Sequence, residues 1–84
     1  MKYYIDGLTF DSNTGNNSKY TVVYNNRTIH FGDKRYQQYE DKIGHYSDLD
    51  HKDVKRRKLY LNRHKNDNFD DPNYASYYSN KYLW

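Results

Sequence analysis

The sequence predicts an α+β fold, in which a small antiparallel β-hairpin or a three-stranded sheet packs against two C-terminal helices. Three observations predict it. β-branched and aromatic residues cluster in residues 1–32, between turn-forming Gly, Asn and Asp. Residues 51–66 contain good helix formers and neither Gly nor Pro. Only 14 of the 84 residues are Leu, Ile, Val or Phe, so the 12 Tyr and the single Trp are needed to fill a core.

The main hairpin is predicted over residues 19–31. Residues 19–24 and 27–31 flank Asn25-Asn26, which suits a two-residue turn between paired strands. Side chains alternate along a strand, so one face of the first strand receives Tyr20, Val22 and Tyr24.

A third strand is expected from the N-terminal residues. Residues 2–5 and 8–10 flank Asp6-Gly7, a dipeptide that accepts the positive φ angles of a type I′ turn. Residues 12–18 are polar and form the loop that leads to the main hairpin.

The helices are expected in the second half of the chain. Residues 33–50 show no clear period, which predicts a loop with one helical turn near residues 36–42. Asp48 or Asp50 offers an N-cap carboxylate for a basic helix over residues 51–66.

A second, aromatic helix is predicted within residues 70–84. Asp70 and Asp71 provide capping carboxylates before Pro72, and proline suits the first helical position. This helix is expected to run from Pro72 to about Tyr82, and the chain as a whole is interpreted as one small domain.

Length and composition exclude several classes of protein. A domain of this length buries only about 60% of its unfolded surface, which leaves no room for a large enzyme with its own cofactor fold. The chain has no Cys, which excludes disulfides, thiolate zinc sites and cysteine nucleophiles. No apolar run is long enough to span a membrane and no apolar segment follows Met1, so we expect a soluble, unprocessed protein without a membrane partner.

Positive charge is concentrated in one segment. Residues 51–65 contain seven Lys and Arg against one acid, Asp53, which gives a local charge of +6 within a chain of net charge +3. On a helix, 100° per residue puts one arc of cations around Leu59: Lys52, Lys55, Arg56 and Arg63. The opposite, packed side is expected to hold Val54, Tyr60, Leu61 and His64.

This arc predicts binding to nucleic acid, DNA rather than RNA. Four cations along about 16 Å of helix match the spacing of several backbone phosphates. Arg57 and Lys58 lie at the margins of the arc and are expected to assist. Two alternatives stay open: a solvated helix face with no ligand, and contact with an anionic protein surface.

Aromatic residues crowd the C-terminal segment. They are Tyr74, Tyr77, Tyr78, Tyr82 and Trp84. Such rings can stack bases, but with so few aliphatic residues we interpret them mainly as core. Any ring left exposed is a candidate for contact with another protein.

The histidines and acids do not predict a metal or catalytic site. His51 and His64 are 13 residues apart and lie about 140° apart around a helix, so they cannot bind one ion from that element. We expect structural roles for all four histidines, His30, His45, His51 and His64, and no cofactor. The chain has no nucleophile elbow, glycine-rich phosphate loop or HExxH motif, and Asp70-Asp71 is interpreted as a cap, so we expect a protein that is not an enzyme.

Short motifs follow one another from His30 to the C-terminus. They are His30-Phe31-Gly32, Tyr46-Ser47-Asp48, His51-Lys52-Asp53, Tyr60-Leu61-Asn62-Arg63-His64, Phe69-Asp70-Asp71-Pro72, Ala75, Ser79 and Leu83-Trp84. Their order resembles a family of small uncharacterised proteins of giant DNA viruses, the nucleocytoplasmic large DNA viruses. That family shows HFG, GYSD, HKD, a basic stretch ending RYIxRH, WxDP, AGxxS and LW. A stretch of about nine residues around Asp33 to Ile43 looks inserted relative to this pattern, and Phe69 stands in place of Trp.

The resemblance implies a viral source but no activity. It implies a location in the virion, in a viral factory of the host cytoplasm or in the host nucleus. Two functions therefore remain: sequence-independent nucleic-acid binding through the basic helix, or a virion component or interaction module. The second would use exposed aromatic residues to contact a viral or host protein or a second copy of the chain.

Overall fold

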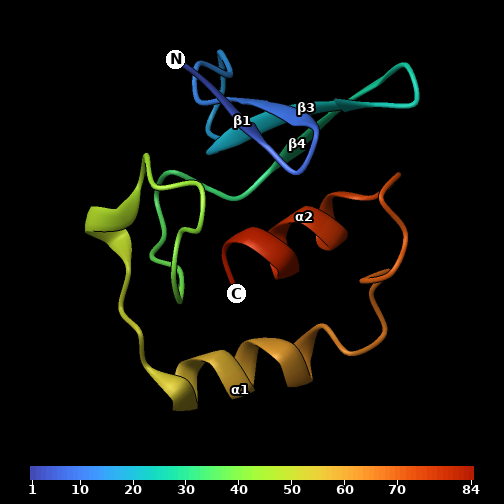
Figure 1. Ribbon diagram of the computed structural model, residues 1–84. Helices are drawn as coiled ribbons and strands as arrows, with labels where there is room; N and C mark the ends of the chain where they lie inside the picture. Colours follow the sequence, from blue (N-terminus) through green and yellow to red (C-terminus); the bar gives the residue numbers. More distant parts are fainter.

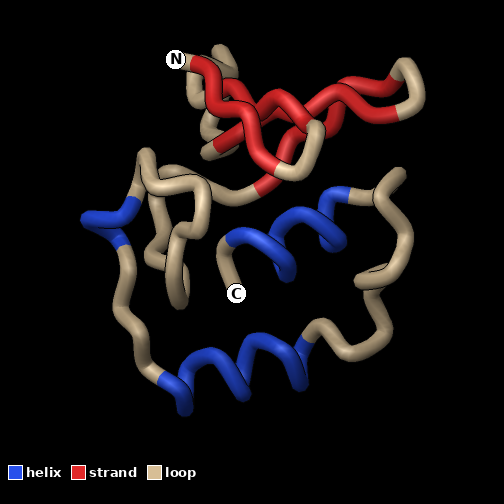
Figure 2. The backbone as a smooth tube through the Cα atoms, viewed as in Figure 1, coloured by secondary structure: helices blue, strands red, loops and turns tan.

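The computed structural model describes residues 1–84 and confirms the α+β fold. A four-stranded antiparallel sheet forms one layer. Figures 1 and 2 show helix α2 (Ala75–Tyr82) lying between this sheet and helix α1 (Val54–Arg63). The basic helix therefore forms an outer layer rather than lying directly on the strands.

The sheet is a simple meander of strands β1 (Lys2–Ile5), β2 (Leu8–Asp11), β3 (Tyr20–Tyr24) and β4 (Arg27–Phe31). Both predicted hairpins form, so the sheet has four strands, one more than the three expected. The φ angles are 54° and 75° at Asp6 and Gly7, and 53° and 62° at Asn25 and Asn26. These positive values confirm two-residue turns at the dipeptides that predicted them.

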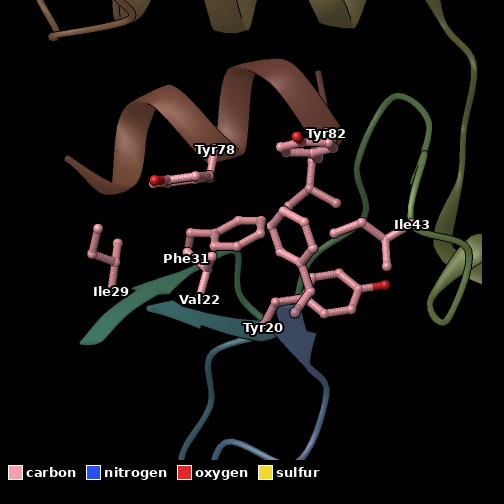
Figure 3. Close-up of a cluster of buried hydrophobic side chains, with 9 residues drawn as sticks. Tyr20, Val22, Ile29, Phe31, Ile43, Tyr78 and Tyr82 are labelled. Carbon is pink, nitrogen blue, oxygen red and sulfur yellow. The ribbon is translucent and has the colours of Figure 1, made fainter. Parts of the chain in front are cut away.

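The core lies on one face of this sheet, under α2 (Figure 3). Its nine buried residues are Phe10, Tyr20, Val22, Ile29, Phe31, Ile43, Tyr78, Tyr82 and Leu83. The rings meet largely edge to face, as for Phe10 and Tyr82, whose centroids are 4.8 Å apart. The opposite face of the sheet is left uncovered, with Tyr4 77% and Val23 62% exposed.

The segment from residue 33 to residue 50 contributes to the interior. It contains no helix near residues 36–42, contrary to expectation, and its one helical turn is the 3-10 helix Ser47–Leu49. Asp41 is buried and accepts hydrogen bonds from the Tyr20 hydroxyl and from the amides of Ile43 (2.9 Å) and Tyr46 (2.8 Å). A local helix is lost because these carboxylate bonds hold the backbone in a turn.

This segment also pairs with the end of α2. The amide of Glu40 donates to the carbonyl of Leu83 (3.0 Å), and the amide of Lys42 donates to the carbonyl of Tyr82 (2.9 Å). These bonds satisfy carbonyls that the helix end would otherwise leave free.

Helix α1 is shorter than the predicted 51–66. Asp53 is its N-cap, and its carboxylate accepts from the amides of Lys55 (2.9 Å) and Arg56 (3.3 Å). The prediction that Asp48 or Asp50 caps the helix is wrong. The Asp50 carboxylate instead accepts from the Gln38 side chain (2.5 Å) and the Asp41 amide (2.7 Å).

Helix α2 begins at Ala75 and not at Pro72. The Asp71 carboxylate accepts from the amide of Asn73 (3.0 Å) and so stabilises a turn before the helix. The N-cap of α2 is Tyr74, which makes no side-chain capping bond, so the predicted cap at Asp70-Asp71 is wrong. Neither α1 nor α2 has the length and apolar character needed to cross a membrane.

Candidate functional site

The basic side chains of α1 are free of acidic partners. None of the Lys and Arg residues between Lys52 and Arg63 forms an ion pair with an Asp or Glu side chain. Arg56 and Arg63 are exposed and line the same pocket, so they lie on one side of the helix as predicted. Lys55 and Lys58 are exposed and line no pocket. Lys52 is exposed just before the helix, with a φ of 52°.

Arg57 differs from its neighbours because it points inward. Its Nε donates to the main-chain oxygen of Trp84 (2.6 Å), and its guanidinium carbon lies 5.3 Å from the centre of the Tyr39 ring. The side chain is half-buried and connects α1 to the C-terminal residue. Arg57 therefore makes a structural contact and is not a surface cation.

Tyr60 lies beside Arg56 and Arg63, not on the opposite side of the helix as predicted. Residues three and four positions apart share a helix face, and all three side chains line one pocket. Tyr60 stacks on Trp84, and its hydroxyl lies 3.1 Å from Ser79 Oγ of α2. Val54, expected to pack, is 52% exposed because it begins the helix beyond the edge of the core.

The pocket lies between α1, the segment that follows β4 and the end of the chain, and encloses about 460 Å³. Three of its twelve lining residues are strongly basic and one is acidic. The lining comprises Lys19, Gly32, Asp33, Tyr36, Gln37, Arg56, Tyr60, Arg63, His64, Ser79, Leu83 and Trp84. The pocket thus brings together the residue before β3, the segment after β4 and one side of α1.

Lys19 is the residue that sequence reasoning missed. It is only 2% exposed, and its ammonium donates to the Tyr36 carbonyl (2.8 Å) and to Gln38 Oε1. Burial lowers the pKa of Lys19, because removal from water disfavours the charged form. No pattern marks it, since Lys19 is out of phase with the inward-facing Tyr20 and Val22.

Asp33, the single acid of the pocket, is already engaged. Its carboxylate accepts from the Arg35 side chain at 3.0 Å (Nε) and 2.8 Å (Nη2), and from the Arg35 amide at 2.9 Å. These hydrogen bonds lower the pKa of Asp33 to about 2. The excess positive charge of the pocket is therefore carried by Lys19, Arg56 and Arg63.

The C-terminal aromatic residues divide into core and surface. Tyr78 and Tyr82 are buried, and Tyr77 and Trp84 pack against the core with part of their surface exposed. Tyr74 is 48% exposed. Of this set, Tyr74 is therefore the residue most available for contact with another protein.

The histidines make separate local contacts. His64 Nδ1 lies 2.8 Å from Asp67 Oδ2, and its ring stacks on Tyr60 with centroids 4.4 Å apart. His45 Nδ1 lies 2.6 Å from the Tyr3 hydroxyl. No group of three or more His, Asp and Glu side chains is arranged to hold a metal ion.

Comparison with known proteins gives one match. A family model described as a family of unknown function matches residues 9–64, which run from β2 to the end of α1. This part includes Lys19, Arg56 and Arg63 but not α2 or Trp84. No curated protein and no solved structure matches the chain.

Proposed function

We propose that this chain, which belongs to the family of unknown function DUF5754, is a non-enzymatic protein that binds nucleic acid without sequence preference. The binding surface is the exposed basic side of α1 with the residue before it. Its cations are Lys52, Lys55, Arg56, Lys58 and Arg63.

One observation carries this proposal: Arg56 and Arg63 share a side of α1 and neither makes an ion pair. Arginines on a folded surface that lack acidic partners are available to phosphate oxygens, which they bind through paired N–H groups. Phosphate contacts of this kind give affinity that does not depend on base sequence.

The test is the affinity for mixed-sequence duplex DNA at NaCl concentrations from about 50 to 200 mM, where four phosphate contacts give a log–log slope of roughly −3 to −4. The double variant Arg56→Glu/Arg63→Glu is expected to lose binding. A matched control is Lys2→Glu/Arg27→Glu, which changes the net charge equally at exposed positions outside α1. No binding by the native chain at low salt, or equal loss in both double variants, refutes the proposal.

We further propose a viral source for the chain. The ordered motifs from His30 to Trp84 support it, because they follow the pattern of the giant-virus proteins. On this proposal the protein acts in the virion, the viral factory or the host nucleus. Its presence in purified virions, measured by mass spectrometry, distinguishes the first location from the other two.

A second candidate function is contact with another protein or self-association. The uncovered face of the sheet favours it, since Tyr4 of β1 and Val23 of β3 are both exposed on that face, on either side of β2. Light scattering separates the two candidates. A monomer with salt-dependent DNA affinity supports the first, and a salt-insensitive oligomer without DNA affinity supports the second.

A further inference from the structure

We propose that the pocket beside α1 is a binding site for the phosphate group of a nucleoside 5′-phosphate, either free or at the end of a strand. This inference goes beyond the helix surface, because it concerns a half-open pocket that would take a phosphate monoester. The residues proposed to bind the phosphate are Lys19 at the interior of the pocket and Arg56 and Arg63 at its exposed side.

The first step is the convergence of charge. Lys19 comes from the turn into β3 and the two arginines from α1, so segments far apart in the sequence bring three cations to one cavity. The side chain of Arg63 makes no hydrogen bond within the protein, and the side chain of Arg56 uses only one donor, Nη1, which bonds to Gln37 Oε1 (2.8 Å). Both guanidinium groups therefore keep free N–H groups for an oxyanion.

The second step is that Lys19 is a buried cation without a counterion. Its two acceptors, the Tyr36 carbonyl and Gln38 Oε1, are neutral, and an ammonium has a third N–H. Three carboxylates act on it from a distance, and other groups hold each of them. Asp33 is paired with Arg35, Asp41 accepts from Tyr20 and two amides, and Asp50 accepts from Gln38 and an amide. A bound anion would compensate a charge that is costly to bury unpaired.

The third step is size and shape. A volume of about 460 Å³ is larger than a phosphate ion needs and falls within the usual range for small-molecule sites. The Tyr60 ring contacts the rings of both Trp84 and His64. The Trp84 ring also contacts the ring of His51, so neither ring is an open platform for a base. The Tyr36 ring also lines the pocket and is 65% exposed, which makes it the ring available to a nucleobase.

Trp84 makes the site measurable, because it is the only tryptophan and lines the pocket. Adenosine 5′-monophosphate (AMP) is the probe, titrated at low salt while the Trp84 fluorescence is followed. We expect a saturable change with AMP, a weaker one with inorganic phosphate and none with adenosine. Absence of AMP binding at millimolar concentration overturns the inference.

Variants of α1 give a matched test. Arg56→Gln and Arg63→Gln each remove a pocket cation and are expected to weaken AMP binding by about tenfold or more. Lys55→Gln and Lys58→Gln remove equal charge from the same helix outside the pocket, and are expected to change it by less than about twofold. Equal effects of the two pairs overturn the assignment, as does an acidic peptide that binds as tightly as AMP.

The two sources of the ligand, and the two proposals, are separable with the same reagents. A single strand with a 5′-phosphate that binds more tightly than its 5′-hydroxyl form assigns the site to strand ends. Equal binding of both forms, with AMP still bound, assigns it to free nucleotides. If the native chain binds AMP but not duplex DNA, the proposed function alone is refuted. If it binds duplex DNA but not AMP, the pocket proposal alone is refuted.

Discussion

The ring of Tyr60 in α1 lies parallel to the ring of Trp84, with centroids 4.1 Å apart and planes 3° apart. Together with the Arg57 bond to the main-chain oxygen of Trp84, this stack attaches the outer helix to the rest of the molecule. Helix α1 buries no residue completely, so its position depends on a few side chains.

Removal of the stack should therefore destabilise the protein. We expect Tyr60→Ala to lower the free energy of unfolding by about 2–4 kcal/mol, since it removes a half-buried ring and a stacked pair. Tyr60→Phe keeps the ring and loses only the contact with Ser79, which should cost about 1 kcal/mol. Urea unfolding followed by circular dichroism measures both, and equal midpoints for the native chain and Tyr60→Ala would contradict this role.

Gly32 is predicted to be intolerant of any side chain. Its φ is +73°, and an added Cβ would lie 2.8 Å from Leu83 Cδ1 and 3.0 Å from Lys19 Cβ. Gly32→Ala should cost roughly 2–4 kcal/mol, from backbone strain and overpacking together. Gly15, with a φ of +72° and open space around it, is the control. Gly15→Ala should cost only about 1 kcal/mol, and thermal melts that place the two variants at the same midpoint would exclude the steric part.

His51 predicts a loss of stability in weak acid. Its Nδ1 accepts from the Asp53 amide (2.9 Å), while Nε2 is buried without a partner. Burial lowers the pKa of His51 below the ordinary 6.5. The unfolded chain therefore takes up this proton first as the pH falls, so stability present above about pH 6.5 declines below it.

The measurement is the urea midpoint at pH 8, 7, 6 and 5 for the native chain and for two variants. His51→Gln should flatten the profile. His30→Gln, at an exposed position on the uncovered sheet face, should leave it unchanged. An identical decline in all three proteins would assign the effect to other groups.

Buried tyrosines predict a second loss of stability in alkali. Burial raises the pKa of Tyr78 to about 12 from an ordinary value of 10, and its hydroxyl donates to the Pro72 carbonyl (2.6 Å). Burial and the bond to Asp6 raise the pKa of Tyr82 as well. The phenols ionise first in the unfolded chain, so stability is complete below pH 10 and falls as the pH rises from 10 towards 12.

Absorbance at 295 nm follows phenolate formation. Tyr78 and Tyr82 should ionise only with unfolding. Compared with the native chain, Tyr78→Phe should remove an absorbance change that coincides with the loss of circular dichroism. If the change that Tyr78→Phe removes precedes the loss of circular dichroism, Tyr78 is in contact with water in the folded state.

The strands could be predicted from sequence because their signals are local. Asp6-Gly7 and Asn25-Asn26 specify tight turns on their own, and alternation then assigns the covered face. The helix starts could not be placed in the same way. Asp48, Asp50 and Asp53 are equivalent as capping residues in the sequence, and only the bonds from Gln38 and Asp41 to Asp50 decide among them.

The basic helix could be predicted, but the pocket could not. Charge density identified Arg56 and Arg63, whereas Lys19 joins them only because the segment from Asp33 to Gln38 folds over the start of β3. The sequence of that segment has no helical or strand period. Its conformation depends instead on the hydrogen-bond partners of Gln38 and Asp41. Long-range hydrogen bonds of this kind leave no local signature.

The hydroxyl of Tyr82 donates to the Asp6 carboxylate (2.7 Å), a bond that links residues 76 positions apart. Tyr78, Tyr82 and Leu83 cover the sheet. The apolar face of the strands therefore lacks its packing partners until residues 78–83 have left the ribosome. Nascent chains that stop before α2 should therefore stay protease-sensitive, and the protein should acquire its structure in one late, cooperative step rather than progressively during translation.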